Sequence, residues 1–429
     1  MLYNNWLFTG SLNIDTVYCP PLKENVNCDV LVIGGGFTGL HAAHRLVDAG
    51  KKVILLDKHI CGGSSSGQSG GFLTPESEED LDLLIQRHGK KTAETIYQIP
   101  IKGVDLILSA IRKYKFNCDL RKQDSIYLSI KSKHNKLIEE EADARKDMGL
   151  PYEMLDKKGL RRVHPGKGYL VGLRCPGSYG INSFSYTQEM KNLLINKGVR
   201  IYEDSEVKHL KGNTAKTSLG SVTAKNICVC IDKMKDEFSK DISEHLYHLQ
   251  IYMTSSEPLS KRVINSMFPD GELMCWDARW NYAYYRIVEG DRLVLGGSSQ
   301  LTLYDKMLRY SPKVILGFIN ELKGRFPLLK DVSFPFYWGG LVDVTRDTTP
   351  IADYDSGNKS IQYALGCVGL PWAAFCGDYL ARRILNPEKT EDLSRFLGLK
   401  RKYFMPLGVQ KMVGKPLSFA LSHLYHMLK

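Results

Sequence analysis

The chain has 429 residues, which is enough for two domains that each bury a sizeable core. Its 43% hydrophobic and 24% charged residues are typical of a soluble globular protein. The net charge of +11 is compatible with nucleic acid, a membrane surface or an acidic substrate, but the basic residues are scattered and no nucleic-acid-binding motif is present. For that reason no nucleic-acid partner is predicted. No apolar run reaches ~18 residues, so no membrane span is predicted either.

The ten cysteines form no C-x-x-C pair, so the sequence predicts neither a metal site nor a dithiol redox site. Cys228 and Cys230 stand in an apolar run, where cysteine behaves as a small hydrophobe. Free thiols in this number suit a reducing compartment. The N-terminus lacks the basic and apolar regions of a signal peptide, so we expect a cytoplasmic protein.

The predicted elements begin after an irregular stretch over residues 1–25. Residues 26–57 predict a strand, a helix and a second strand. Helical patterning then continues to about residue 115, and we expect Ser77 to cap its start, with Asp80 in the first turn. Further helices are predicted at 131–147, 184–197, 311–324 and 371–385, and strands at 121–129, 169–174, 200–231, 245–256, 282–287 and 292–296.

This order predicts an α/β protein, α+β overall, in which two discontinuous domains share the chain. One is a Rossmann-like nucleotide-binding domain, expected over residues 1–90, 165–235 and 330–390. The other is a substrate domain on a mixed or antiparallel sheet, expected over 91–164 and 236–329. Residues 391–429 form a C-terminal extension that is interrupted by Pro and Gly. It could dock on the protein, touch a membrane surface peripherally or bind a partner.

A nucleotide-binding turn follows the first long strand. Gly34, Gly36 and Gly39 form G-x-G-x-x-G between a strand and a helix. Gly34 permits the tight turn, Gly36 the approach of a pyrophosphate, and Gly39 close packing of helix and strand. Asp57 ends the second strand, where a carboxylate accepts hydrogen bonds from ribose hydroxyls and disfavours a 2′-phosphate. The sequence therefore predicts a dinucleotide other than NADP.

The next segment, "GGSSSGQSGGF" at 62–72, bears on the choice between FAD and NAD. Its hydroxyl and N–H groups could line the inner half of an extended dinucleotide, the alternative being a flexible surface loop. Glycine-rich strand ends return at 338–340 and 366–369. An NAD-dependent dehydrogenase does not explain these later glycines.

The motifs "DVLVIGGGFTGLHAAHRL", "SSGQSGG", "DARWNYAYYRIVEGDRLVLGGS", "FYWGGLVDVTRDTTPIAD" and "YALGCVGLPWAA" stand in the order of the D-amino-acid oxidase superfamily of FAD-dependent oxidoreductases. The resemblance covers roughly residues 26–390 and is strongest to gamma-glutamylputrescine-oxidase-like proteins. It implies oxidation of a carbon–nitrogen bond by hydride transfer to flavin N5, followed by hydrolysis of the imine. O2 or an unknown acceptor would reoxidise the flavin.

The resemblance also implies which residues bind FAD. Val207 falls where the family's backbone contacts adenine, and the helix that starts near Pro371 should direct its positive end at the flavin N1/O2 edge. No Cys or His stands at a position of covalent attachment, so non-covalent FAD is expected. The implied binding residues are Gly34, Gly36, Phe37, Thr38, Gly39, Asp57, Lys58, Ser65, Ser66, Gln68, Ser69, Gly70, Gly71, Val207, Gly339, Gly340, Gly366, Gly369 and Leu370.

Several positions depart from the family pattern. Gln68 and Ser69 replace the usual Arg-Asn pair, and Leu370 replaces a His. Val342 stands where amino-acid oxidases place an arginine that grips the substrate carboxylate. All of these departures, Val342 included, keep open a non-catalytic FAD-binding subunit. The departure at Val342 also favours a small-molecule amine over a simple amino acid, with a D-amino-acid dehydrogenase or oxidase as the alternative.

The substrate pocket is expected on the strands between 245 and 296. Tyr282, Tyr284 and Arg286 share one face if their segment is a strand, and Tyr252 lies on the strand that lines the family's pocket. Tyr252, Tyr284 and Arg286 are therefore the candidate catalytic residues. The alternatives are tyrosines packed in a core and arginines, including Arg279, held in salt bridges.

Overall fold

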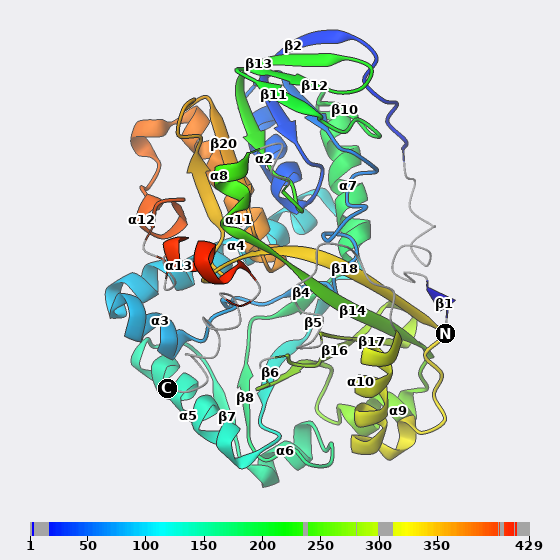
Figure 1. Ribbon diagram of the computed structural model, residues 1–429. Helices are drawn as coiled ribbons and strands as arrows, with labels where there is room; N and C mark the ends of the chain where they lie inside the picture. Colours follow the sequence, from blue (N-terminus) through cyan, green and yellow to red (C-terminus); the bar gives the residue numbers. More distant parts are fainter. Residues whose placement is uncertain are drawn as a thin grey trace.

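The computed structural model describes residues 2–3, 17–234, 239–279, 281–298, 312–401, 403, 407–415 and 417. Two large sheets dominate it, one at the top and one across the lower half of Figure 1. A three-stranded sheet joins segments that are distant in sequence. Its strands are β4 (Phe72–Leu73), β9 (Tyr179–Gly180) and β5 (Arg121–Lys122).

The upper sheet has eight strands and contains the predicted nucleotide-binding start. Strands β10, β3, β2, β13 and β20 run parallel in that order, which is the arrangement of a doubly wound fold. Strands β12, β11 and β19 extend it antiparallel. The strands are β2 (Asn25–Ile33), β3 (Val53–Leu56), β10 (Arg200–Tyr202), β11 (His209–Lys211), β12 (Thr214–Lys216), β13 (Ser221–Val229), β19 (Ile351–Tyr354) and β20 (Ile361–Leu365).

Both faces of this sheet are buried, which explains why β2 reads as a continuous apolar run. Val30 and Val32 face one core together with the helices, whereas Leu31 and Ile33 face a second core. The helices that contribute most residues to the first core are α2 (Phe37–Asp48), α4 (Lys90–Tyr114), α7 (Ser183–Asn196) and α11 (Leu370–Leu385).

Close backbone contacts position helix α11. A Cβ on Gly377 would lie 2.0 Å from the carbonyl oxygen of Thr38 in α2. A Cβ on Gly103 would lie 2.0 Å from the carbonyl oxygen of Pro371. Only glycine permits these approaches, so α2 and α4 together set where the first turn of α11 lies.

The lower sheet has nine strands in the order β1-β18-β14-β17-β16-β15-β6-β8-β7. All pairs are antiparallel except β1–β18 and β15–β6, so the predicted mixed sheet is confirmed. Strands β14 and β18 lie side by side across the molecule (Figure 1). The strands are β1 (Leu2–Tyr3), β6 (Asp124–Leu128), β7 (Glu153–Leu155), β8 (Gly172–Cys175), β14 (Leu246–Pro258), β15 (Leu273–Asp277), β16 (Tyr284–Val288), β17 (Arg292–Gly297) and β18 (Phe336–Thr345).

The remaining helices include α5, which matches the helix predicted at 131–147, and α10, which matches 312–324 of the helix predicted at 311–324. Residue 311 lies outside the described residues. No helix in the described ranges has the length and apolar character needed to cross a membrane. These helices are α3 (Leu81–His88), α5 (Ser132–Asp147), α6 (Lys157–Val163), α8 (Lys240–Ser243), α9 (Lys261–Met267), α10 (Pro312–Arg325), α12 (Ser394–Leu397) and α13 (Leu407–Val413), with single 3-10 turns at Glu289–Asp291, Pro327–Leu329 and Pro387–Lys389.

Three predictions differ from the structure. Helix α3 begins at Leu81, and Ser77 accepts a hydrogen bond from the Glu79 N–H in the preceding turn, so Ser77 is not the cap. The strand predicted at 169–174 starts only at Gly172. Strands β8 and β18 belong to the nine-stranded sheet, although residues 165–235 and 330–390 were assigned to the nucleotide-binding domain. The sheet pairing of these strands is long-range and leaves no local signal.

Within the C-terminal extension, residues 407–415 dock at the start of β14. The Gln410 side chain donates to the Glu244 carbonyl at 2.7 Å and accepts from the Tyr247 hydroxyl at 2.5 Å. The Lys415 ammonium donates to the Ser243 carbonyl at 2.7 Å. Residues 418–429, on which part of the membrane alternative rested, lie outside the described residues.

Candidate active site

The glycine turn has the geometry that its sequence predicts. Gly34 has φ +105°, and a Cβ there would lie 2.3 Å from the Cys230 carbonyl oxygen. A Cβ on Gly39 would lie 1.8 Å from the Gly34 carbonyl oxygen, which confirms its role in close packing. A Cβ on Gly36 would lie 2.8 Å from Ser66 Oγ. The turn is therefore too tightly packed for side chains, and Gly34 and Gly36 line the cavity with their backbone at the start of α2.

Asp57 reinforces this turn from the end of β3. Its carboxylate accepts from the Gly35 N–H at 2.7 Å and from the His59 N–H at 2.8 Å. Burial raises the pKa of this carboxyl, while the two backbone hydrogen bonds oppose that rise. Asp57 thus faces the same space as the glycine turn and is held in one orientation.

One large cavity, of about 1470 Å³, begins at this turn. It lies at the carboxyl ends of the parallel strands β2, β3, β13 and β20, where open α/β sheets bind ligands. It then continues to the faces of β14, β16 and β18 in the other sheet. Seventeen of the predicted cofactor residues line it, namely Gly34, Gly36, Phe37, Thr38, Asp57, Lys58, Ser65, Ser66, Gln68, Ser69, Gly70, Gly71, Val207, Gly340, Gly366, Gly369 and Leu370.

Two predicted cofactor residues do not line the cavity. Gly39 lies against the backbone of Gly34. A Cβ on Gly339 would point toward Gln250 and the Ile251 carbonyl on β14, 3.1 and 3.2 Å away. Neighbouring residues on a strand face opposite sides, so Gly340 faces the cavity and Gly339 does not.

The Ser/Gly loop is packed between the two sheets and is not a surface loop. Ser66 Oγ accepts from the Phe37 N–H at 3.1 Å, which ties the loop to α2. Ser65 Oγ donates to Asp232 and to the Leu341 carbonyl. On the other side, the Trp338 indole donates to the Gln68 carbonyl at 2.9 Å. These bonds hold the loop along the middle of the cavity.

Tyr252, a candidate catalytic residue, faces away from the cavity. Its side chain is fully buried in the hydrophobic core of the lower sheet, among residues such as Tyr285 and Phe318. Ile251 and Met253 are the neighbours on β14 that line the cavity. The alternation of side chains along the strand accounts for this correction.

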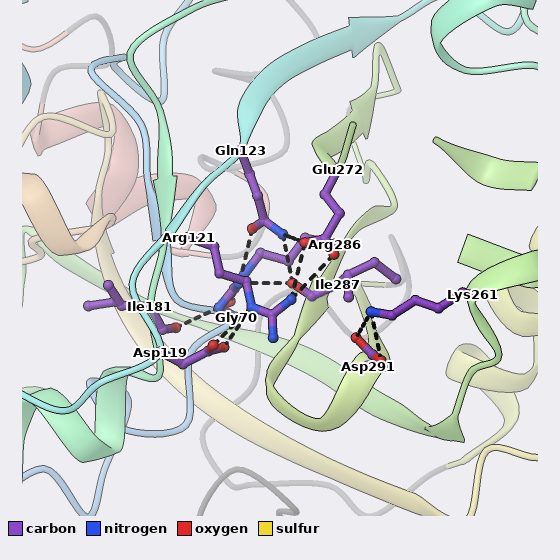
Figure 2. A network of polar contacts seen from close by, with 10 residues as sticks. All are labelled: Gly70, Asp119, Arg121, Gln123, Ile181, Lys261, Glu272, Arg286, Ile287 and Asp291. Carbon is purple, nitrogen blue, oxygen red and sulfur yellow. Dashed lines mark hydrogen bonds and ion pairs between the residues drawn. The ribbon is translucent and has the colours of Figure 1, made fainter. Parts of the chain in front are cut away.

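The prediction for Arg286 is also corrected, because Arg286 is not among the residues that line the cavity. Its guanidinium lies behind the lining residue Gly70 and donates to the carbonyls of Gly70 at 2.6 Å and Ile181 at 2.5 Å (Figure 2). It also donates to Gln123 Oε1 at 3.2 Å and the Ile287 carbonyl at 3.1 Å. Burial lowers its pKa to about 10. Arg286 therefore holds the Ser/Gly loop onto β16, whereas Arg279 forms the expected ion pairs, with Asp277 and Glu321.

Aromatic residues form the far wall of the cavity. Tyr284 lines it, as predicted, and its ring meets Phe72 edge-on at 5.5 Å between centroids. The Tyr282 ring lies 5.8 Å from that of Tyr284 and is 36% exposed because it faces the cavity. Trp276 and Trp338 also line the cavity. These rings enclose a region at the end opposite the glycine turn.

The sequence reasoning missed a carboxylate in this region. Glu78 lines the cavity and accepts from the Tyr282 hydroxyl at 3.3 Å. The acidic run at 76–82 was interpreted only as the start of a helix. Its unusual number of carboxylates just after the Ser/Gly loop was the signal available.

Comparison with known proteins places this geometry in a family. Residues 29–383 match the DAO family, described as FAD dependent oxidoreductase. The chain is 28% identical to an oxidoreductase named OrdL from Haemophilus influenzae over 391 residues, covering 89% of this chain and 88% of the relative. It is 26% identical to gamma-glutamylputrescine oxidoreductase from Escherichia coli over 380 residues, covering 87% and 86%.

The fold matches a solved structure of glycine oxidase from Geobacillus kaustophilus, with a TM-score of 0.76 and 16% identity, covering 88% of this chain and 99% of that chain. That structure and this one share the architecture of a nucleotide-binding sheet facing a mixed sheet. The family match spans both sheets and the whole cavity between them. The chain therefore belongs to the DAO family of FAD-dependent oxidoreductases.

Proposed function

We propose that this protein oxidises a carbon–nitrogen bond of a small amine or substituted amino acid. The observation that carries the proposal is the single cavity that runs from the glycine turn, past the Ser/Gly loop, to an aromatic wall. FAD would supply the hydride-accepting chemistry, and the imine product would be hydrolysed by water. The protein's part is to orient the substrate and exclude competing solvent.

The lining residues fit an extended dinucleotide. The backbone at Gly34 and Gly36, with the start of α2, would hold the pyrophosphate, and Asp57 the ribose. The loop from Ser65 to Gly71 would follow the ribityl chain and flavin. The N-terminus of α11, at Gly369, would favour negative charge at the N1/O2 edge. A smaller cofactor would leave the second half of this lining unused.

Non-covalent attachment is supported by the cysteine nearest to the loop. Cys61 is fully buried, does not line the cavity, and has a pKa raised well above its ordinary value by burial. Such a thiol is a poor nucleophile. Acid precipitation of the purified protein should release all the flavin into the supernatant. Flavin that stays with the pellet would contradict this part of the proposal.

The cavity favours an amine over a simple amino acid. Each of the four arginines that line it already has a partner in the protein. Arg87 pairs with Glu79, Arg145 with Glu76, and Arg279 with Asp277, while Arg346 contacts the His245 and Tyr403 rings. Val342 lines the cavity where an amino-acid oxidase would place its arginine. An aromatic wall suits a cationic or apolar amine.

The test is anaerobic bleaching of the flavin-containing protein by a panel of amines, with D-alanine and glycine included. We expect amines to bleach the flavin faster than either amino acid. D-alanine or glycine outperforming every amine would favour the second candidate, a D-amino-acid dehydrogenase, which the D-amino acid dehydrogenase of Methylobacterium nodulans supports at 24% identity. Flavin that no compound bleaches would favour a non-catalytic FAD-binding subunit.

Two further features support a cytoplasmic location for this enzyme. Its electron acceptor is proposed to be O2 or another compound. All ten cysteines are free, and nine of them are buried, which suits a reducing compartment. The segment 407–415 docks on β14, so any contact with a membrane would be made by the residues that follow it. Co-sedimentation with anionic liposomes, with and without residues 418–429, tests that contact. Oxygen consumption with the substrate found in the panel tests the acceptor.

A further inference from the structure

The segment from Glu76 to Asp82 lays five carboxylates along the cavity, and two of them have cationic partners. Glu76 pairs with Arg145 at 3.1 Å and Glu79 pairs with Arg87 at 2.7 Å. In the described part of the chain Glu78, Asp80 and Asp82 form no ion pair with a Lys, Arg or His. Of these three, Glu78 is the one that reaches the aromatic wall, where it accepts from the neutral Tyr282 hydroxyl at 3.3 Å. A carboxylate that faces a cavity without a protein cation is suited to a cationic ligand.

Glu78 stands at the place where the substrate must lie. Its Oε1 atom is 3.9 Å from the position of a Cβ on Gly369, the residue that precedes α11. On the other side it meets Tyr282, whose ring is beside that of Tyr284. The carboxylate thus lies between the aromatic wall and the helix end that would face the flavin.

The surroundings of Glu78 leave its negative charge poorly compensated. The Glu78 side chain is exposed toward the cavity. Desolvation by the surrounding cavity walls still raises the pKa of its carboxyl, and the charge of Glu76 raises it further. The hydrogen bond from Tyr282 opposes this rise but brings no positive charge. A bound cation would supply the positive charge that is missing beside Glu78. The same cation would also be attracted to the neighbouring tyrosine rings.

We propose that Glu78 binds the protonated nitrogen of the substrate between the Tyr282 and Tyr284 rings. The proposal rests on the function proposed above and narrows its substrate class to amines whose protonated nitrogen carries an N–H to donate to the carboxylate, which excludes quaternary ammonium compounds. A carboxylate placed directly beside the reacting nitrogen would meet Glu78 and be repelled. Glu78 is therefore the residue that sets specificity for amines.

Binding can be measured separately from turnover. The probe is tert-butylammonium, which has no hydrogen on the carbon next to nitrogen and cannot be oxidised to an imine. Pivalate has the same shape and the opposite charge. Isothermal titration calorimetry on the flavin-containing protein should show tert-butylammonium binding, and a Kd at least about tenfold weaker in Glu78→Gln. Pivalate should show no binding to either.

The matched control is Glu79→Gln, which removes the adjacent carboxylate, already paired with Arg87. Its Kd for tert-butylammonium should stay within about twofold of the unmodified protein. Tyr282→Phe is a second variant that keeps the carboxylate and removes the hydroxyl that orients it. A twofold to fivefold weaker Kd is expected there, and it keeps the proposal testable if Glu78→Gln fails to fold.

The outcomes separate this proposal from the function it rests on. Equal affinity of tert-butylammonium for Glu78→Gln and the unmodified protein, or tighter binding of pivalate, overturns the role of Glu78. Normal amine turnover with an unchanged KM in Glu78→Gln also overturns it, while leaving the proposed oxidation intact. Binding that depends on Glu78 in a protein that no amine reduces supports the ammonium site and refutes the oxidation.

Discussion

Replacing Arg286 with lysine tests whether this side chain holds the Ser/Gly loop or binds substrate. Arg286 is fully buried, and its planar fork donates in three directions to four acceptors (Figure 2). Lysine keeps the buried charge but has a single nitrogen that cannot replace a fork. It can reach about two of the four acceptors, so about two buried acceptors lose their donor, at about 1–3 kcal/mol each.

We therefore expect Arg286→Lys to lower the free energy of unfolding by about 3 kcal/mol, seen as a lower urea midpoint by circular dichroism. Arg45→Lys is the control, because the Arg45 side chain is 45% exposed and makes one ion pair, with Asp378, that a lysine can keep, and the loss should stay below about 1 kcal/mol. An unchanged urea midpoint combined with a raised KM for the amine would refute this reasoning. It would show that Arg286 binds the substrate.

Three other changes have defined outcomes. Gly34→Ala forces a Cβ to 2.3 Å from the Cys230 carbonyl oxygen at φ +105°, so the purified protein should carry less flavin per chain, measured by absorbance. The control is Gly50→Ala, which has φ +74° and no atom within 4 Å of the new Cβ, and it should keep its flavin. Lys191→Met leaves the fully buried Glu203 charge without its partner and should cost about 3–5 kcal/mol in urea unfolding; a loss below about 1 kcal/mol would show that the pair is not needed. The hydrogen bond to Asp343 raises the pKa of His248 above its ordinary 6.5, so the stability it contributes is complete below pH 6.5 and is lost as the pH rises through the raised pKa. His248→Gln should remove that decline from a series of thermal melts, and parallel melting profiles for the two proteins would contradict the assignment.

The residues of the nucleotide end were predictable because their constraints are local. The turn from Gly34 to Gly39 and the acid at Asp57 belong to one strand–helix–strand unit of about thirty residues, and the positive φ of Gly34 and the contact of Gly39 with Gly34 both arise within that unit. The substrate end was less predictable. Tyr284 lines the cavity, but Tyr252 and Arg286 do not. Tyr252 is on the face of β14 that is turned away from the cavity, and the Ser/Gly loop covers Arg286 on the same face of β16 as Tyr284.

By itself the sequence determined the family, the alternation of strands and helices, and the position of the glycine turn, since all three depend on short-range patterns and on motif order. Only the tertiary structure decided that Arg286 supports the loop from behind and that Glu78 faces the aromatic wall. Both side chains meet partners 163 to 216 residues away in the chain, such as Gly70, Gln123 and Tyr282. Pairing of that range comes from how the two sheets pack, and no local pattern encodes it.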